Sequence, residues 1–219
     1  HPQIRTTVAC NYSDIDRLNA CQFLVTYTCD LMPSPEETAA IRAWLDKGGK
    51  WLALHGTNSA LDLPRPNGVE SPRCFPTWVD TLGSQFIAHP PIRPYVVDVV
   101  APEHWLVRGI EPFSTDDELY LSEYHGIIEP LLETHWSGDT GLNGFETNLW
   151  PDNDARLVLY RRPLGDGCVL YFTLGHCRSH FDVIELLPFW THPERCSWNY
   201  PVYYETLRRG IRWAMSEIA

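Results

Sequence analysis

The hydrophobic pattern of this chain consists of short apolar runs separated by glycine, proline and polar residues. Such runs, bounded by turn-forming residues, predict buried strands. The runs predicted as strands are 4–10, 21–28, 51–54, 95–100, 156–160 and 168–173. The last two are separated by a short segment rich in glycine and proline, which predicts a hairpin. No repeat or low-complexity tract interrupts the pattern, so we interpret 1–219 as a single domain.

Helical periodicity is clearest in residues 34–49. Ser34 is a typical N-cap, and a proline and two glutamates follow it in the first turn. Ile41, Trp44 and Leu45 form one apolar stripe, and a Gly-Gly pair ends the helix. Strand, helix and strand in this order predict a βαβ unit and a mostly parallel sheet. Two further helices are predicted at 77–82 and 203–216.

Composition and charge narrow the class of protein. Of the 219 residues, 44% are hydrophobic and 12% are aromatic, which is enough for a packed core. The formal net charge is −11 and only 17 residues are basic. Nucleic acid is therefore not an expected partner, because phosphate binding needs clustered lysine and arginine. No apolar stretch is long enough to cross a bilayer, so no membrane partner is expected either.

The seven cysteines are scattered and include no CxxC pair. This usage favours reduced thiols and therefore predicts a cytoplasmic location. A signal peptide that had been removed would leave no trace in the sequence, so the prediction depends on the cysteines alone.

Histidines follow two of the predicted buried strands. His55 comes directly after 51–54, and His176 follows 168–173 after a Leu-Gly pair. Open α/β sheets bind ligands beyond the carboxyl ends of their strands, so we predict that both imidazoles face one cleft. A histidine in this position can be a base, a hydrogen-bond donor or a metal ligand. It can equally be a histidine held by local backbone bonds, and both interpretations stay open.

Other polar residues add weaker signals. His89 precedes two prolines, which hold it in an extended conformation that suits a positioned side chain or an ordinary loop. Glu118 follows two aspartates; such a run is usually solvated, but the adjoining leucine and Tyr120 predict that one acid turns inward. His176 and His180 have the spacing of a helical metal site, although the preceding glycine indicates a turn instead.

Taken in order, these motifs resemble the ThuA-like (trehalose utilisation) family. The resemblance extends from about residue 22 to residue 216. The matching motifs are Gly48-Gly49, Leu54-His55-Gly56, the Gly-Ser-Gln-Phe-Ile-Ala-His-Pro stretch at 83–90, the histidine-containing loop 104–109, Asp117-Glu118-Leu119-Tyr120, Leu174-Gly175-His176 and Trp213-Ala214.

The resemblance implies a flavodoxin-like α/β fold related to the class I glutamine amidotransferases. It implies a mostly parallel sheet flanked by helices, with a C-terminal hairpin and helix. His55 stands where that superfamily has its nucleophilic cysteine, so glutamine amidotransferase activity is not expected. The family opens with a strand and a Gly-x-x-x-His-type segment that this chain lacks, so we expect a domain without its first strand and helix. The stretch 137–154 also departs from the family and leaves the sugar unidentified.

The resemblance also implies a role in carbohydrate catabolism, and two hypotheses follow. In the first, the chain converts a sugar or 3-keto-sugar by acid–base chemistry. The catalytic residues would be His55, Glu118 and His176, and the substrate-binding residues would be His89, Tyr120 and His180. A variant has the histidines hold a divalent metal that polarises a carbonyl.

The second hypothesis is a non-catalytic carbohydrate-binding or interaction module that kept the fold. Convergence of the histidines and Glu118 on one cleft would favour the first hypothesis, and dispersal over separate surfaces would favour the second. The partner in both is a small-molecule sugar, and a homo-oligomer is compatible with either.

Overall fold

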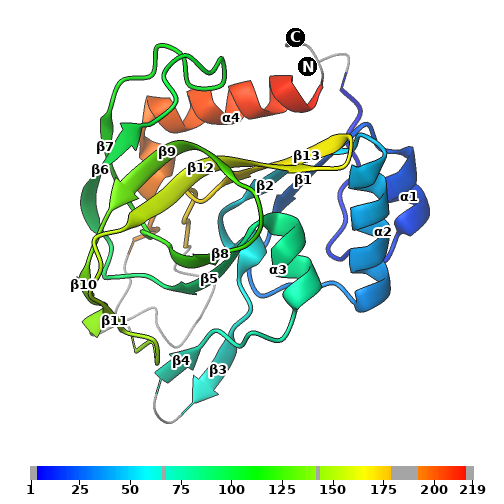
Figure 1. The fold of residues 1–219 in the computed structure, drawn as a ribbon. Helices are drawn as coiled ribbons and strands as arrows, with labels where there is room; N and C mark the ends of the chain where they lie inside the picture. The colour runs from blue at the N-terminus through cyan, green and yellow to red at the C-terminus, as the bar shows by residue number, and fades with distance from the viewer. Residues whose placement is uncertain (1–3, 66–67, 142–143, 179–191, 216–219) are drawn as a thin grey trace.

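A computed structural model describes residues 4–65, 68–141, 144–178 and 192–215. A seven-stranded sheet with the order β1-β2-β13-β12-β9-β6-β7 forms the body of the fold (Figure 1). The helices are α1 (Ile15–Ala20), α2 (Pro35–Asp46), α3 (Pro76–Leu82) and α4 (Pro201–Ala214). The strands of this sheet are β1 (Phe23–Tyr27), β2 (Lys50–Leu54), β6 (Arg93–Val99), β7 (Phe113–Asp117), β9 (Glu129–His135), β12 (Ala155–Leu164) and β13 (Gly167–Phe172). The remaining strands pair two by two: β3 (Asp62–Arg65) with β4 (Gly68–Glu70), β5 (Ser84–Ala88) with β8 (Leu121–Tyr124), and β10 (Gly138–Asp139) with β11 (Leu149–Trp150).

The predicted βαβ unit is confirmed as β1–α2–β2, whose strands pair in parallel. Ser34 caps α2 by accepting a hydrogen bond from the backbone N–H of Glu37, and the Glu37 carboxylate accepts one from the N–H of Ser34. This reciprocal capping box satisfies donors that the helix start would otherwise leave free. The apolar stripe of α2 is buried, as its spacing predicts.

The sheet is mixed, and the prediction of a mostly parallel sheet was wrong. β2 lies parallel to β1 and β13, whereas the pairs from β13 through β12, β9 and β6 to β7 are all antiparallel. A parallel pair needs a crossover connection, usually a helix. Within the described residues no α-helix lies between β6 and β12, so this half of the sheet has none. The predicted C-terminal hairpin is confirmed as β12–β13, followed by α4.

Helices cover both faces of the sheet. In Figure 1, α4 lies along one side of the strands, and α2 and α3 lie on the other. Leu52 of β2 belongs to the apolar cluster that includes Tyr203 of α4, whereas its neighbour Trp51 belongs to the cluster of Trp44 and Trp78 from α2 and α3. Successive residues of a strand face opposite sides, so β2 is buried on both faces. Its carboxyl end is therefore where polar side chains can emerge.

Two segments differ from the sequence-based expectation. Residues 4–9 form no strand although their composition predicts one; Val8 is 86% exposed, so the apolar residues of this segment are not buried by a neighbour. The composition of residues 62–76, which are rich in proline, predicts an irregular loop, but part of this stretch forms the short β3–β4 pair. None of the described helices has the length and apolar character that crossing a membrane requires.

Candidate functional site

The ends of two adjacent strands place His55 and His176 next to each other. β2 and β13 pair in parallel up to Leu54 and Phe172, so the residues that follow leave the sheet at the same edge. His55 has φ +47°, a left-handed conformation that non-glycine residues seldom adopt. The Tyr171 hydroxyl donates a hydrogen bond to the His55 carbonyl oxygen and so holds this turn.

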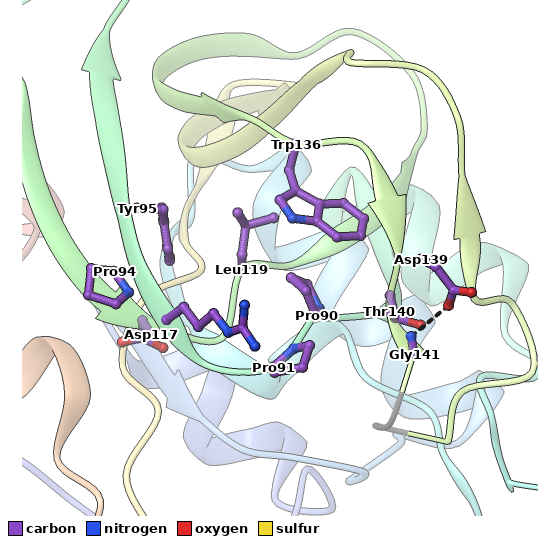
Figure 2. A pocket seen from close by; sticks show the side chains of 11 residues that line it. Pro90, Pro91, Pro94, Tyr95, Asp117, Leu119, Trp136, Asp139, Thr140 and Gly141 are labelled. Carbon is purple, nitrogen blue, oxygen red and sulfur yellow. Dashed lines mark hydrogen bonds between the residues drawn. The ribbon is translucent and has the colours of Figure 1, made fainter.

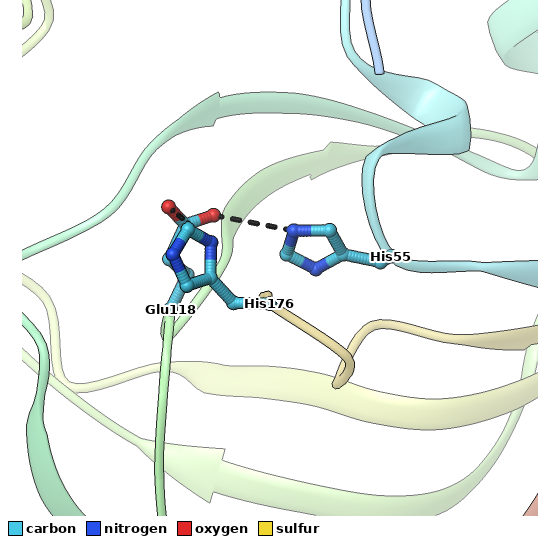
Figure 3. Close-up of side chains that lie close together, drawn as sticks. All are labelled: His55, Glu118 and His176. Atoms are coloured by element: carbon cyan, nitrogen blue, oxygen red, sulfur yellow. Dashed lines mark ion pairs between the residues drawn. The ribbon is translucent and has the colours of Figure 1, made fainter. Parts of the chain in front are cut away.

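Glu118 lies at the centre of the site, in the link between β7 and β8 (Figure 3). Its Oε1 is 2.9 Å from His176 Nδ1 and 3.4 Å from His89 Nε2. Its Oε2 is 3.5 Å from His55 Nε2. The Glu118 side chain is only 12% exposed, so these contacts are shielded from water. The structure therefore brings one carboxylate together with imidazoles from separate segments of the chain.

Tyr120 completes the contacts around His55. The His55 Nδ1–H donates to the Thr173 carbonyl oxygen at 3.0 Å, so in the neutral ring Nε2 is an acceptor. The Tyr120 hydroxyl, 3.2 Å away, donates to that Nε2. Tyr120 thus lies in the same cluster as the predicted catalytic residues, whereas His180 lies outside the described residues.

Asp117, which the sequence analysis did not single out, anchors the loops of the site. Its Oδ1 accepts hydrogen bonds from the backbone N–H groups of Glu118 and His176, at 2.8 and 3.1 Å. Its Oδ2 accepts from those of Gly175 and Ser197, at 3.0 and 3.3 Å. The acidic run was expected to turn one acid inward, but two turn inward: Asp117 holds backbone and Glu118 meets the imidazoles. The run of acidic residues was the only feature of the sequence that pointed to a role for Asp117.

Glu194 is a second residue that the sequence did not indicate. Its Oε2 is 3.3 Å from His176 Nε2, so His176 lies between two carboxylates. Backbone hydrogen bonds of 2.9 Å in both directions between Arg178 and Glu194 hold the two segments together. An isolated glutamate in a loop carries no sequence pattern, which explains why this contact was missed.

A cleft of about 560 Å³ opens beside the cluster. The residues that line it include Phe86, His89, Glu118, Phe145, His176 and Arg178. His55 is not among the lining residues; it is 8% exposed and reaches the cleft through Glu118 and Tyr120. The cleft thus combines aromatic faces with charged groups, the mixture that a sugar ring with apolar C–H faces and hydroxyls requires.

A second hollow, of about 410 Å³, shares Pro91 with this cleft (Figure 2). The indole of Trp136, the prolines at 90 and 91 and Thr140 surround it. Asp139 accepts a hydrogen bond from the Gly141 N–H at 2.6 Å and so closes a tight turn at its edge. No described imidazole lines this hollow, so the cluster around Glu118 is the better candidate for chemistry.

Electrostatics separate the protonation states within the cluster. Burial raises the pKa of Glu118, but the hydrogen bond from His176 and the nearby imidazoles lower it to about 2. Burial lowers the pKa of His176, yet the hydrogen bonds to Glu118 and Glu194 raise it above its usual value overall. Burial lowers the pKa of His55 and outweighs the charge of Glu118. One imidazole therefore favours the charged form and another the neutral form, the division that acid–base catalysis requires.

Replacing Glu118 by Gln is expected to lower the pKa of His176, because the main group that raises it is lost. A raised folded-state pKa stabilises the fold below about pH 6.5 and loses this contribution as pH rises through the raised value. The variant should therefore lose less stability than the wild type as pH rises above about 6.5. Histidine-ring NMR titration and urea unfolding measure the two effects, and an unchanged His176 titration would contradict the assignment.

The sequence matches the family model of ThuA, described as trehalose utilisation, over residues 3–189. No curated protein shows a significant match to it.

Among solved structures, the chain is similar to a ThuA-like protein from Bacteroides uniformis, with 15% identity and a TM-score of 0.63 over 94% of this chain and 75% of that one. A ThuA-like protein from Parabacteroides merdae shares 16% identity, with a TM-score of 0.51 over 74% of this chain and 62% of that one. A cytoplasmic protein from Salmonella typhimurium shares 15% identity, with a TM-score of 0.53 over 94% of this chain and 76% of that one. At these identities the likeness shows the fold alone.

Proposed function

Because the chain belongs to the ThuA family, we propose that it converts a sugar or 3-keto-sugar in carbohydrate catabolism by proton transfer at the Glu118 cluster. The family description, trehalose utilisation, supports the carbohydrate role. The observation that carries the catalytic part is a buried carboxylate within 3.5 Å of imidazoles from distant segments, at the wall of a cleft.

The cluster suits proton transfer next to a sugar carbonyl. His176, which favours its charged form between two carboxylates, would donate a proton to the carbonyl oxygen. The His89 Nδ1–H donates to the Pro90 carbonyl oxygen at 2.8 Å, so in the neutral ring Nε2, which lies 3.4 Å from Glu118 Oε1, is the acceptor that would take the proton from the substrate. Glu118 would stay ionised and stabilise the imidazolium. His55 is the buried partner that positions Glu118, and Tyr120 and His89 would also contact hydroxyls.

The alternative is a carbohydrate-binding module without catalysis. Such a module has no need to hold histidines in different protonation states around a buried acid, and its histidines would be expected on separate surfaces. The convergence of His55, His89 and His176 on Glu118 therefore supports the enzyme hypothesis over this alternative.

Replacing His55 by Ala should lower turnover of 3-keto-disaccharides by about 100-fold, because Glu118 and Tyr120 lose the ring that orients them. The expected change is in kcat and its pH profile more than in KM, since His55 does not line the cleft. His135→Ala is a matched control: that ring also faces a glutamate, Glu133 at 3.4 Å, but it is largely exposed. Unchanged turnover in the His55 variant would count against catalysis at this site.

A further inference from the structure

In His55 and in His176, the ring nitrogen that points away from Glu118 makes a hydrogen bond. This bond determines which nitrogen of each ring carries the proton. His55 Nδ1 lies 3.0 Å from the Thr173 carbonyl oxygen, and His176 Nε2 lies 3.3 Å from the Glu194 carboxylate. Both oxygens can only accept a hydrogen bond, so in each neutral ring the N–H is on the nitrogen that points away from Glu118. The lone pairs of His55 Nε2 and His176 Nδ1 then point at the carboxylate of Glu118. The Tyr120 hydroxyl donates to His55 Nε2, and the remaining pair of acceptors in this buried site, His176 Nδ1 and Glu118, needs either a proton or a metal ion between them.

The spacing of these atoms fits a metal ion. One ring nitrogen of His55, a carboxylate oxygen of Glu118 and one ring nitrogen of His176 all lie within 4.8 Å of one another. Glu118 Oε2 lies 3.5 Å from His55 Nε2, and Glu118 Oε1 lies 2.9 Å from His176 Nδ1. Bonds of about 2.0–2.1 Å around a tetrahedral ion separate neighbouring ligand atoms by about 3.3 Å, so the side chains would close around the ion where their ligand atoms lie up to 4.8 Å apart.

The outer contacts also match those of metal-binding histidines. Such a histidine usually donates its second N–H to a backbone carbonyl or a carboxylate, which fixes the ring and its tautomer. Thr173 supplies the carbonyl for His55, and Glu194 supplies the carboxylate for His176. Asp117 adds a further constraint, because it holds the backbone N–H of His176.

We propose that His55, Glu118 and His176 bind one divalent transition-metal ion, with the remaining coordination positions open to the cleft. Two imidazoles and one carboxylate favour Zn²⁺, Fe²⁺, Co²⁺ or Mn²⁺ over Mg²⁺ and Ca²⁺, which prefer oxygen ligands. Binding of the ion does not depend on the proposed sugar reaction, but its role in catalysis rests on that proposal. There the ion would polarise the sugar carbonyl in place of the His176 proton, and His89 would still accept the substrate proton.

The test uses the whole chain after removal of metals with a chelator. ZnCl₂, MnCl₂, CoCl₂ and MgCl₂ are each added, and bound metal and the unfolding temperature are measured. We expect one equivalent of at least one transition metal, and a rise in Tm of roughly 5–10 °C when the ion is at about 100 times its Kd. MgCl₂ should give no such rise. Glu118→Gln and His176→Asn should weaken binding by about 100-fold or more, whereas His135→Gln should bind like the wild type.

Several outcomes would overturn the metal site. One is that none of Zn²⁺, Mn²⁺ and Co²⁺ binds to the protein stoichiometrically. Another is that a Glu118→Gln variant folds in the presence of the chelator and then binds the metal as tightly as the wild type. A thiolate charge-transfer band in the Co²⁺ spectrum would also overturn it, because the ion would then be on cysteine.

Turnover assays separate this proposal from the sugar chemistry. If chelated protein converts a 3-keto-disaccharide at the full rate, the catalytic role of the ion fails and the proposed function stands. If the ion binds and no sugar is converted, the metal site stands and the proposed function fails.

Discussion

Replacing Glu118 by Gln should reduce kcat for 3-keto-disaccharides by about 1,000-fold or more, with a much smaller change in KM. The substitution keeps the shape of the side chain and an oxygen that can accept from His176, but it removes the charge shared by the surrounding imidazoles. An imidazolium at His176 is then stabilised by Glu194 alone, and the charged acid of the proposed reaction is largely lost. His89 and Tyr120 still face the substrate, so binding should largely persist.

Glu123→Gln is the matched control for this experiment. Glu123 lies in the adjoining strand β8 and forms an exposed ion pair with Arg73 at 2.7 Å. The same chemical change at that position should leave kcat within about twofold, because an exposed ion pair contributes little. Circular dichroism checks that both variants fold. A Glu118→Gln enzyme with near-wild-type kcat would rule out the carboxylate as part of the reaction.

Replacing Asp117 by Ala should destabilise the protein by about 3–5 kcal/mol. The carboxylate accepts backbone hydrogen bonds from Glu118, Gly175, His176 and Ser197, and it is 1% exposed. Alanine leaves these buried N–H groups without an acceptor, at about 1–3 kcal/mol each before water enters the space. For a chain of this size, 1 kcal/mol corresponds to about 2–4 °C, so Tm should fall by about 10 °C.

Two further variants make this result specific. Asp117→Asn keeps one acceptor oxygen and should recover part of the lost free energy of unfolding. Asp98→Ala removes an exposed aspartate from the neighbouring strand β6 and should change stability by less than about 0.5 kcal/mol. Urea unfolding followed by fluorescence measures all three. A loss below about 1 kcal/mol in Asp117→Ala would show that the N–H groups find water instead.

The part of the fold that depends on local signals could be predicted. Ser34, the apolar stripe of α2 and the Gly-Gly pair define a helix between two strands without reference to the rest of the chain. The hairpin β12–β13 is likewise encoded by its turn. The antiparallel half of the sheet could not be predicted, because an apolar run specifies a strand but not its neighbour. The run at 4–10 shows the same limit: it has the composition of a strand but no partner.

The candidate site also has residues that local sequence signals predict and residues that they do not predict. His55 and His176 could be brought together from sequence because each follows a buried strand, and strand ends of a parallel pair lie side by side. Glu118 was indicated by apolar neighbours within an acidic run. The role of Asp117 could not be predicted, since it depends on backbone N–H groups from 58 to 80 residues away. His55 was expected to face the cleft, and only the structure places it behind Glu118 and Tyr120.

The pairing of β2 with β13 has a consequence for the order of folding. It brings His55 to Thr173, which is 118 residues further along the chain, whereas β12 and β13 join through a tight turn. Loop-closure entropy makes a distant contact slower to form than a local one. During refolding the hairpin should therefore appear early, and the imidazoles should meet Glu118 only after the long loop closes. Regained ligand binding would thus mark the completion of the topology and not the first collapse of the chain.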